Sequence, residues 1–540
     1  MARSEAAEGL PDEAGGGNQG NARFFARMVN FPGDRRPIVC LFAPPAYLWD
    51  MTIHFPFQNT YSALPANFFA RVAPTPVASP RLIKLNRPLA VQLGLDPDLL
   101  AAPEGAEILA GKRLPDGADP IAMAYAGHQF GHFVPQLGDG RAILLGEVID
   151  KDGVRRDIQL KGSGPTPFSR RGDGRAALGP VLREYIVSEA MFAMGIPTTR
   201  SLAAVITGEA VMRETALPGA VLTRVASSHI RVGTFQFFAA RGDTDGVRAL
   251  ADHVIARHYP DLKNADQPYH ALLAAVVARQ AALIARWLHV GFIHGVMNTD
   301  NTSISGETID YGPCAFLDAY NPAQVFSSID EMGRYAYANQ PRIGLWNLTR
   351  LAECLLPLYS DDQEKAIEQA QPILGEFPEK FTTAYNAGLR AKVGLFTARD
   401  GDEALIQDLL DAMAKNAADF TLTFRHLGNA AADDATDVRA QFTDPAAFDE
   451  WAARWRARLA LEPQSAVERR AAMHAVNPAF IPRNHRIEAV IAAAVNKDDY
   501  APFEELLNVL AKPFEDQPQY AAYADPPLPE QRVTQTFCGT

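Results

Sequence analysis

The sequence predicts an α+β fold in which a small sheet-rich lobe is followed by a larger helical lobe. Three observations lead to this prediction: short β-rich segments cluster between residues 137 and 226, one helical segment interrupts them, and helical periodicity dominates from about residue 246 to residue 510. We therefore expect residues 53–245 to form the sheet-rich lobe, residues 246–515 the helical lobe, and residues 516–540 a tail that crosses a surface.

The sheet-rich lobe is expected to be a twisted antiparallel sheet with one helix packed on it. Residues 141–148 and 156–161 are β-rich, and the sequence Asp-Lys-Asp-Gly at 150–153 is a good hairpin turn between them. Residues 180–194 have apolar positions at helical spacing, and Gly195 and Pro197 end that helix. Residues 202–206, 210–213 and 219–226 return to strand.

The helical lobe begins with an apolar stripe at 269–290 that ends at Gly291. A loop-rich, β-like insert follows at 292–317, and helices resume from Leu345 to about Leu510, with amphipathic segments at 446–461 and 487–496. At the other end of the chain, residues 8–21 are rich in glycine and acidic residues and have no period. We expect residues 1–52 to be a disordered extension, and the alternative is that translation starts at Met51.

The composition excludes several classes of protein. The 540 residues are 47% hydrophobic and 21% charged, as in globular proteins, and the net charge of −12 argues against nucleic acid as the main partner. No run of 18 apolar residues occurs, which argues against a membrane partner, and four scattered cysteines cannot form a disulfide framework. We expect a cytoplasmic enzyme, which would be mitochondrial only if the source is eukaryotic.

A lysine and a glutamate have the arrangement of a phosphate-binding pair. Lys161 ends a predicted strand, and the turn before that hairpin contains Gly138, Gly140 and Arg141, whose backbone could approach a phosphate. Glu184 lies on the following helix, and protein kinases use such a strand lysine and helix glutamate to hold nucleotide phosphates. Taken alone, these residues would also fit a tight hairpin with a solvated lysine.

A second group of residues resembles the metal-binding and catalytic loops of kinases. His294 and Asn301 have the spacing of the kinase catalytic loop, and Asp310 opens an Asp-Tyr-Gly triplet like the one that binds metal. However, Val296 occupies the position of the kinase base, and an aliphatic side chain cannot accept a proton. Ordinary γ-phosphoryl transfer therefore lacks its base, unless Asp300 accepts the proton from a different angle.

These motifs resemble the selenoprotein O family of protein adenylyltransferases. The segments at 125–148, 158–191 and 294–318, the last reading HGVMNTDNTSISGETIDYGPCAFLD, are similar to the family's signatures, and the likeness runs from about Ile53 to the C-terminus. The resemblance implies a protein-kinase-like fold that binds ATP in a flipped orientation. It also implies transfer of AMP to Ser, Thr or Tyr hydroxyls of proteins, with release of pyrophosphate.

The resemblance also implies roles for individual residues. Lys161 and Glu184 correspond to the ion pair, Asn301 and Asp310 to the Mg²⁺ (or Mn²⁺) ligands, and Asp300 to the proton acceptor. The implied nucleotide contacts are Gly138, Gly140, Arg141, Lys161, Asp173, Gly174, Arg224, Arg231 and Asp310. A flipped nucleotide would place its outer phosphates where kinases hold adenine. Because an unpaired buried charge is costly, these phosphates would need cationic partners, and Arg141, Arg224 and Arg231 can supply them.

The cysteines and histidines suggest further, weaker hypotheses. A redox-reversible link between Cys538 and Cys314 would hold the tail over the site, and two unpaired thiols are the alternative; the resemblance favours some tail–loop disulfide without identifying the loop cysteine. His128 and His132 could form a metal pair, but without carboxylate partners a packing role is favoured. We expect His294 to hold the loop through backbone hydrogen bonds.

Three rival functions remain open. The first is UMP transfer from UTP with Mn²⁺, which would use the same site. The second is conventional kinase activity, which Val296 disfavours. The third is a non-catalytic nucleotide-binding scaffold, which would not need the complete metal site formed by Asn301 and Asp310. The expected partners are ATP and protein substrates with Ser, Thr or Tyr hydroxyls.

Overall fold

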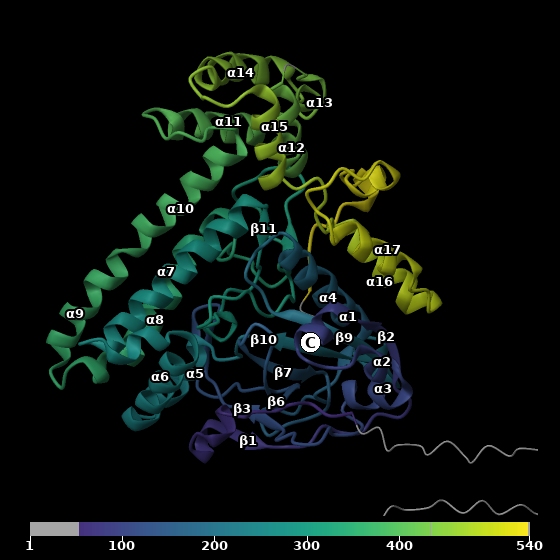
Figure 1. Cartoon of the computed structure of the whole chain (residues 1–540), viewed down its shortest axis with the longest axis vertical. Helices are drawn as coiled ribbons and strands as arrows, with labels where there is room; N and C mark the ends of the chain where they lie inside the picture. Colours follow the sequence, from purple (N-terminus) through teal and green to yellow (C-terminus); the bar gives the residue numbers. More distant parts are fainter. Residues whose placement is uncertain (1–52, 433, 538–540) are drawn as a thin grey trace, which may run out of the picture. The chain divides into compact units, whose positions relative to one another are not determined.

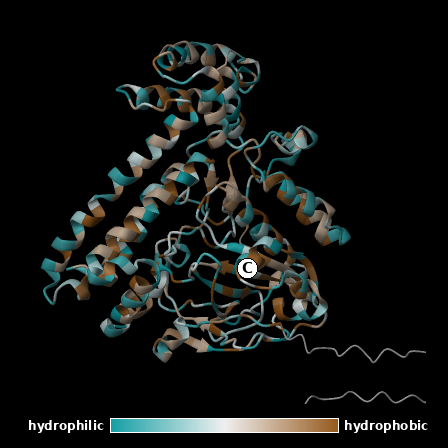
Figure 2. Cartoon of the chain, viewed as in Figure 1, coloured by the Kyte–Doolittle hydropathy of each residue, from teal (hydrophilic) through white to brown (hydrophobic). Residues whose placement is uncertain are grey.

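The computed structural model describes residues 53–432 and 434–537, which form a mixed α/β structure with an antiparallel sheet and many helices (Figure 1). The predicted extension at 1–52, Cys40 and Cys538 lie outside these residues. Hydrophobic and hydrophilic positions alternate along the helices (Figure 2), which is the pattern of helices packed on a core. The boundaries of the two lobes at 245 and 515 stay predictions.

The sheet contains eight strands, ordered β1-β3-β6-β7-β10-β9-β2, with β8 paired beside β10. Its strands are β1 (Phe69–Arg71), β2 (Arg81–Leu85), β3 (Ile121–Met123), β6 (Ala142–Ile149), β7 (Arg155–Lys161), β8 (Ala176–Ala177), β9 (Arg200–Met212) and β10 (Ala216–Ala226). The sequence prediction missed β1, β2 and β3 because strands of three to five residues are too short for their alternation to be recognised.

The predicted hairpin of β6 and β7 is confirmed, and it arranges the site. Its turn uses Gly153, which adopts a φ of +78° that favours glycine. Because side chains alternate along a strand, Gln159 and Lys161 share one face of β7. Arg224 on β10 pairs with Gln159 across the ladder and lies on that same face. Three polar side chains are thus presented together.

The structure corrects the prediction for β9. Residues 202–206 and 210–213 were expected to be separate strands, but β9 runs through both. Gly208 lies in the middle with a φ of +75°, and a Cβ there would come within 2.8 Å of Ser79. The glycine therefore lets the strand continue through an irregular position, where the sequence pattern indicated a break.

Helices cover both faces of the sheet. The predicted helix is confirmed as α4 (Leu178–Ala193), which shares one core with Leu222 of the sheet and is followed by Gly195 at a φ of +74°. The opposite face, which includes Leu160, packs against three short helices that the sequence prediction missed: α1 (Arg87–Gln92), α2 (Pro97–Ala101) and α3 (Pro103–Leu109).

The rest of the described chain is mostly helical, as predicted. The predicted insert at 292–317 is confirmed and contains β11 (Phe292–Ile293) paired with β12 (Ala315–Phe316). The helices are α5 (Val232–Ala239), α6 (Thr244–His258), α7 (Pro268–His289), α8 (Gln340–Tyr359), α9 (Gln363–Gly375), α10 (Phe377–Lys392), α11 (Asp402–Asn416), α12 (Phe420–Ala430), α13 (Thr436–Arg439), α14 (Pro445–Leu459), α15 (Ala466–Val476), α16 (Asn484–Lys497) and α17 (Ala501–Leu510).

Helix α7 is long and apolar enough to cross a membrane by length and composition alone, with a mean hydropathy of 1.5 over its most apolar window. However, 61% of that window is buried inside the protein, where α8 and α10 pack along the helix (Figure 1). A core helix passes the same test, so this composition is weak evidence for a membrane span.

The C-terminal tail lies mostly on the surface, as predicted, but its last described residues are anchored. Thr536 is buried; its backbone N–H donates to Phe326 O at 2.7 Å, and its hydroxyl donates to Pro313 O at 2.6 Å. Phe537 is 66% exposed and lines the cleft described below. The predicted link between Cys538 and Cys314 lies partly outside the described residues and stays a prediction.

A buried histidine that contacts β7 predicts a loss of stability in acid. Burial lowers the pKa of His229 to about 4, although its hydrogen bond to Asp157 opposes that shift. Below pH 6.5 the His229 imidazole is protonated in the unfolded chain but stays neutral in the folded protein. The free energy of unfolding therefore falls as the pH drops from 6.5 toward 4. We expect His229 to lower the free energy of unfolding by about 2 kcal/mol at pH 5, because one pKa unit corresponds to about 1.4 kcal/mol.

The measurement is urea unfolding at pH 7.5 and pH 5.0, for the wild type and His229→Asn. The variant should lose less stability between the two pH values, by about the same 2 kcal/mol. An identical loss in both proteins would contradict the prediction, because the remaining histidines titrate in both.

Candidate active site

All twelve residues predicted for the site line one cleft of about 850 Å³ between the sheet and the segment from 296 to 313. The cleft brings together the following residues: Gly138, Gly140, Arg141, Lys161, Asp173, Gly174, Glu184, Arg224, Arg231, Asp300, Asn301 and Asp310. They come from strands, a helix and loops that are up to 172 positions apart in the sequence, from Gly138 to Asp310.

The predicted ion pair is formed. The Lys161 ammonium lies 2.5 Å from Glu184 on α4 and 3.1 Å from Asp310, and the Lys161 and Glu184 side chains are 13% and 5% exposed. Asp310 has a φ of +63°, a left-handed conformation that is uncommon for a residue other than glycine. Such backbone strain is often found at functional sites.

Two arginines converge on the same carboxylate. Arg224 donates to Asp310 Oδ1 at 2.7 Å and lies 3.3 Å from Glu184, while Arg231 donates to Asp310 Oδ2 at 2.9 Å. Burial would raise the pKa of Asp310, but the charges of Lys161, Arg224 and Arg231 outweigh it and hold that pKa well below its usual range. The carboxylate is therefore ionised at neutral pH.

Arg141 and Asp173 differ from the buried arginines. Arg141 is half-buried, and within residues 53–432 and 434–537 its side chain has no ion pair, which leaves its guanidinium to the cleft. Asp173 is bound by Arg213 at 2.8 Å and accepts a hydrogen bond from the backbone of Arg175. Its visible role is therefore to hold Arg213 at the cleft wall.

The predicted glycines are needed for close approach. Gly138 has a φ of +72°, and a Cβ there would lie 2.3 Å from the ring of Phe168. Gly174 has a φ of +65°, and a Cβ there would meet the backbone of Gly164 at 2.1 Å. At Gly140 a Cβ would lie 3.0 Å from the Phe168 carbonyl oxygen. Any side chain at the first two positions would force the cleft wall apart.

The loop after β11 holds its shape through His294. The His294 Nε2 lies 2.9 Å from the Ile309 carbonyl, so the expected backbone-bonding role is confirmed, and burial lowers its pKa. Asn301 donates its amide N–H to Val296 O at 3.0 Å, which directs the other end of the amide, its oxygen, away from that bond. Val296, at the position of the kinase base, lines the cleft but brings no proton acceptor.

Asp300 supplies a carboxylate next to Asn301. Its side chain is buried, and burial raises its pKa to about 6, with Arg231 and a hydrogen bond from Gln129 acting in the opposite direction. A carboxylate with this pKa is mostly ionised at pH 7 and can accept a proton, which suits a general base.

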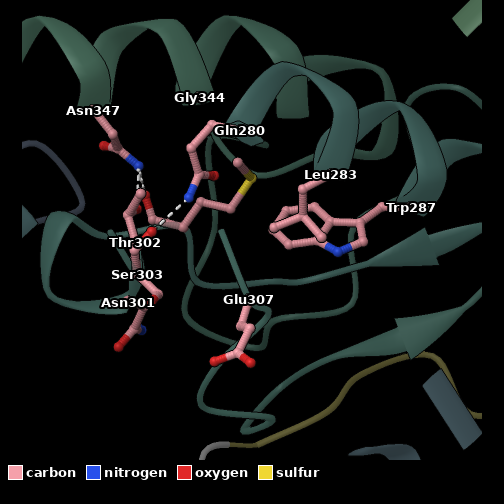
Figure 3. Close-up of a pocket in the computed structure, with 10 residues that line it drawn as sticks. Gln280, Leu283, Trp287, Asn301, Thr302, Ser303, Glu307, Gly344 and Asn347 are labelled. Atoms are coloured by element: carbon pink, nitrogen blue, oxygen red, sulfur yellow. Dashed lines mark hydrogen bonds between the residues drawn. The ribbon is translucent and has the colours of Figure 1, made fainter. Parts of the chain in front are cut away.

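Two core helices hold the loop in place. Figure 3 shows Asn347 of α8 donating to Thr302 Oγ1 and Gln280 of α7 donating to the Ser303 carbonyl, at 2.9 Å and 2.7 Å. Asn301 lies at the edge of the same small pocket. Buried amides thus anchor the two residues that follow Asn301.

The oxygen donors fit a hard divalent cation. Asp310 offers a carboxylate and Asn301 an amide oxygen, and both line the cleft. Across the part of the chain that the structure describes, no group of three or more His, Cys, Asp or Glu side chains could hold a metal. Mg²⁺ usually binds through one or two protein oxygens plus phosphate oxygens and water, so the two oxygen donors of Asp310 and Asn301 are compatible with it.

Several cleft residues were not predicted from sequence. Tyr125 packs under Arg231, whose guanidinium lies 4.6 Å from the ring centroid, and Arg183 has one buried nitrogen without a partner among the described residues. Counted together, eight cationic and five acidic side chains line the cleft. In a chain with a net charge of −12, this local positive excess favours an anionic ligand.

The two histidines of the neighbouring hairpin do not form a metal site with acidic partners. His128 packs against Phe133 and Trp346 with ring centroids 5.0 Å and 5.1 Å away, and its Nδ1 lies 2.8 Å from Gln236. The favoured packing role of His128 is confirmed. The predicted packing role is wrong for His132, which is exposed on the hairpin surface.

A positively charged cleft that holds a lysine–glutamate pair and a buried carboxylate is typical of a nucleotide-dependent transferase. A family model described as protein adenylyltransferase SelO matches residues 51–511. The chain therefore belongs to the SelO family and is a nucleotidyltransferase.

Curated relatives agree with this family. The chain is 84% identical over 491 residues to the protein nucleotidyltransferase YdiU of Bradyrhizobium diazoefficiens. It is 76% and 75% identical, over 491 residues, to the proteins of the same name in Bradyrhizobium sp. strain ORS 278 and Rhodopseudomonas palustris strain BisB18. Each alignment covers 91% of this chain and all of the relative.

Proposed function

We propose that this protein transfers AMP from ATP to Ser, Thr or Tyr hydroxyls of protein substrates, on a kinase-like fold. The proposal rests on where the loop places its proton acceptor. Val296, at the position of the kinase base, is aliphatic, whereas Asp300, next to Asn301, is a buried carboxylate with a pKa of about 6. The matching family is that of the protein adenylyltransferase SelO, and an adenylyl group is AMP from ATP, which supports ATP as the nucleotide.

The reaction is a substitution at the α-phosphorus of ATP. The target hydroxyl oxygen forms a bond to that phosphorus, the bond from it to the oxygen that bridges to the β-phosphorus breaks, and pyrophosphate leaves. The hydroxyl proton passes to Asp300. Asp300 is fit for this step because it is ionised at neutral pH and close to the cleft, whereas Asp310 is held by three cations.

The cationic side chains stabilise the phosphate charges. Lys161 and Arg224 are held by Glu184, and Arg141 and Arg213 also line the cleft. Guanidinium groups bind phosphate oxygens bidentately, which suits a polyphosphate that must be held by its far end. Asn301 and Asp310 would hold Mg²⁺, which supplies charge neutralisation for the leaving pyrophosphate.

The proposal is tested by following which phosphorus reaches protein. The full-length protein is incubated with Mg²⁺ and ATP labelled at the α-phosphate or the γ-phosphate, alone and with added unlabelled protein. We expect protein to be labelled from the α-position only. Label from the γ-position only would contradict adenylylation and indicate a kinase, and no label from either would indicate a non-catalytic scaffold.

The same assay with α-labelled UTP and Mn²⁺ addresses UMP transfer, because we propose phosphate contacts for the cleft residues named above, and ATP and UTP carry the same phosphates. We expect less label from UTP than from ATP at equal concentration. More label from UTP would show that the physiological product carries UMP.

A further inference from the structure

A short hairpin lies on the loop that carries Asp300. It consists of β4 (Gly127–Gln129) and β5 (His132–Val134), which pair antiparallel through a tight turn at Phe130 and Gly131. Three successive hairpin residues contact three successive loop residues: His128 N donates to Thr299 Oγ1 at 2.7 Å, Gln129 Nε2 to Asp300 Oδ2 at 3.2 Å, and Phe130 N to Asn298 Oδ1 at 3.0 Å.

Because side chains alternate along a strand, the two faces of β4 contact different residues. His128 points to the side of Phe133 and Trp346, whereas Gly127 and Gln129 share the face toward Asp300. At Gly127 a Cβ would lie 2.8 Å from Asp300 Oδ1, so the missing side chain provides the room that this oxygen occupies. Gly127 and Gln129 therefore enclose one carboxylate.

The two carboxylate oxygens are held in different ways. Asp300 Oδ2 accepts the hydrogen bond from Gln129, while the buried Oδ1 has no hydrogen-bond partner in residues 53–432 and 434–537. The terminal torsion of an aspartate has broad minima, so a carboxylate without a fixed partner samples many orientations. The hydrogen bond from Gln129 restricts that freedom.

We propose that Gln129 is a positioning residue for the transfer reaction: its amide fixes the Asp300 carboxylate in the orientation that receives the target hydroxyl, and Gly127 provides the space for it. The inference rests on the proposed role of Asp300 as proton acceptor. Gln129 itself does not exchange a proton. Its loss should slow the chemical step, because a misplacement of about 1 Å at a reacting group can cost on the order of 10²-fold in rate.

The test uses Gln129→Met, which keeps the length of the side chain and removes the N–H donor. With α-labelled ATP we expect kcat to fall by roughly 10²-fold, while the dissociation constant of MgATP, measured by equilibrium binding, changes by less than about twofold. Gln407→Met, on the exposed face of α11, is the matched control and should transfer AMP like the wild type.

A second variant keeps the test informative if the first folds poorly. Gly127→Ala places a methyl group against Asp300 Oδ1 and should lower kcat by at least about tenfold with unchanged MgATP affinity. Its control is Gly375→Ala, because a Cβ at Gly375 has nothing within 4 Å.

The outcomes separate this inference from the proposed function. If the wild type transfers no AMP, the proposed function fails. If the wild type transfers AMP and both variants match it, or if both lose MgATP affinity in parallel with kcat, the positioning role is wrong. Faster transfer by Gln129→Met would also overturn it, because the glutamine would then obstruct Asp300.

Discussion

Asp310→Ala should abolish AMP transfer, with a loss of about 10³-fold or more. The change removes the carboxylate expected to bind the divalent cation. It also leaves Lys161, Arg224 and Arg231 without their shared counter-ion, since all three contact Asp310 within 3.1 Å. The measurement is transfer of label from α-labelled ATP, at saturating Mg²⁺ and with the MgATP affinity determined in parallel.

Asp310→Ala also removes one partner of a buried charge cluster, and such a removal is strongly destabilising, so unfolding alone would abolish activity. Asp310→Asn keeps the volume and can still accept hydrogen bonds from the arginines, so it should fold and yet remain inactive. Asp361→Ala, at an exposed position, should retain wild-type transfer. Transfer close to the wild-type rate in folded Asp310→Asn would refute the assignment of Asp310.

Lys161→Ala is expected to lower kcat/KM by about 10²–10³-fold. Lys161 reaches Glu184 and Asp310 from the end of β7 and is 13% exposed, so its ammonium can contact a phosphate without leaving the ion pair. Its removal deletes a cation that stabilises charge in the transition state. It also leaves Glu184 with Arg224 as its remaining partner, at 3.3 Å.

Kinetics distinguish this role from a purely structural one. If Lys161 acts on the phosphates, the variant should show a thermal midpoint near that of the wild type and lose activity at every MgATP concentration. Lys415→Ala, on an exposed turn of α11, is the control. Activity restored by high MgATP alone would mean that Lys161 contributes to ground-state binding and not to catalysis.

Long and periodic segments were predictable from sequence. The apolar stripe of α7 and the β-rich runs of β6 and β7 are long enough to show their period, and glycines such as Gly195 and Gly291 mark helix ends through positive φ. The brief strands and helices before residue 124 were missed because three to seven residues do not define a period.

The candidate site was predictable where chemistry follows a spacing. The cleft contains Lys161, Glu184, Asn301 and Asp310, all found from motif distances along the chain. Gln129 was not found, because its contact with Asp300 joins positions 171 residues apart and depends on how a hairpin docks on a loop. The partners of Asp173 were missed for the same reason: nothing local indicates that Arg213 folds back onto it.

The anchoring of Thr536 beside Pro313 has a practical consequence for anyone who prepares this enzyme. A purification tag fused after Thr540 would be separated by only three residues from Phe537, which lies on the wall of the cleft. Such a fusion would bring foreign peptide, including histidine clusters that capture divalent ions, within reach of the entrance. Assays of metal preference are therefore best made with a removable tag at the other terminus.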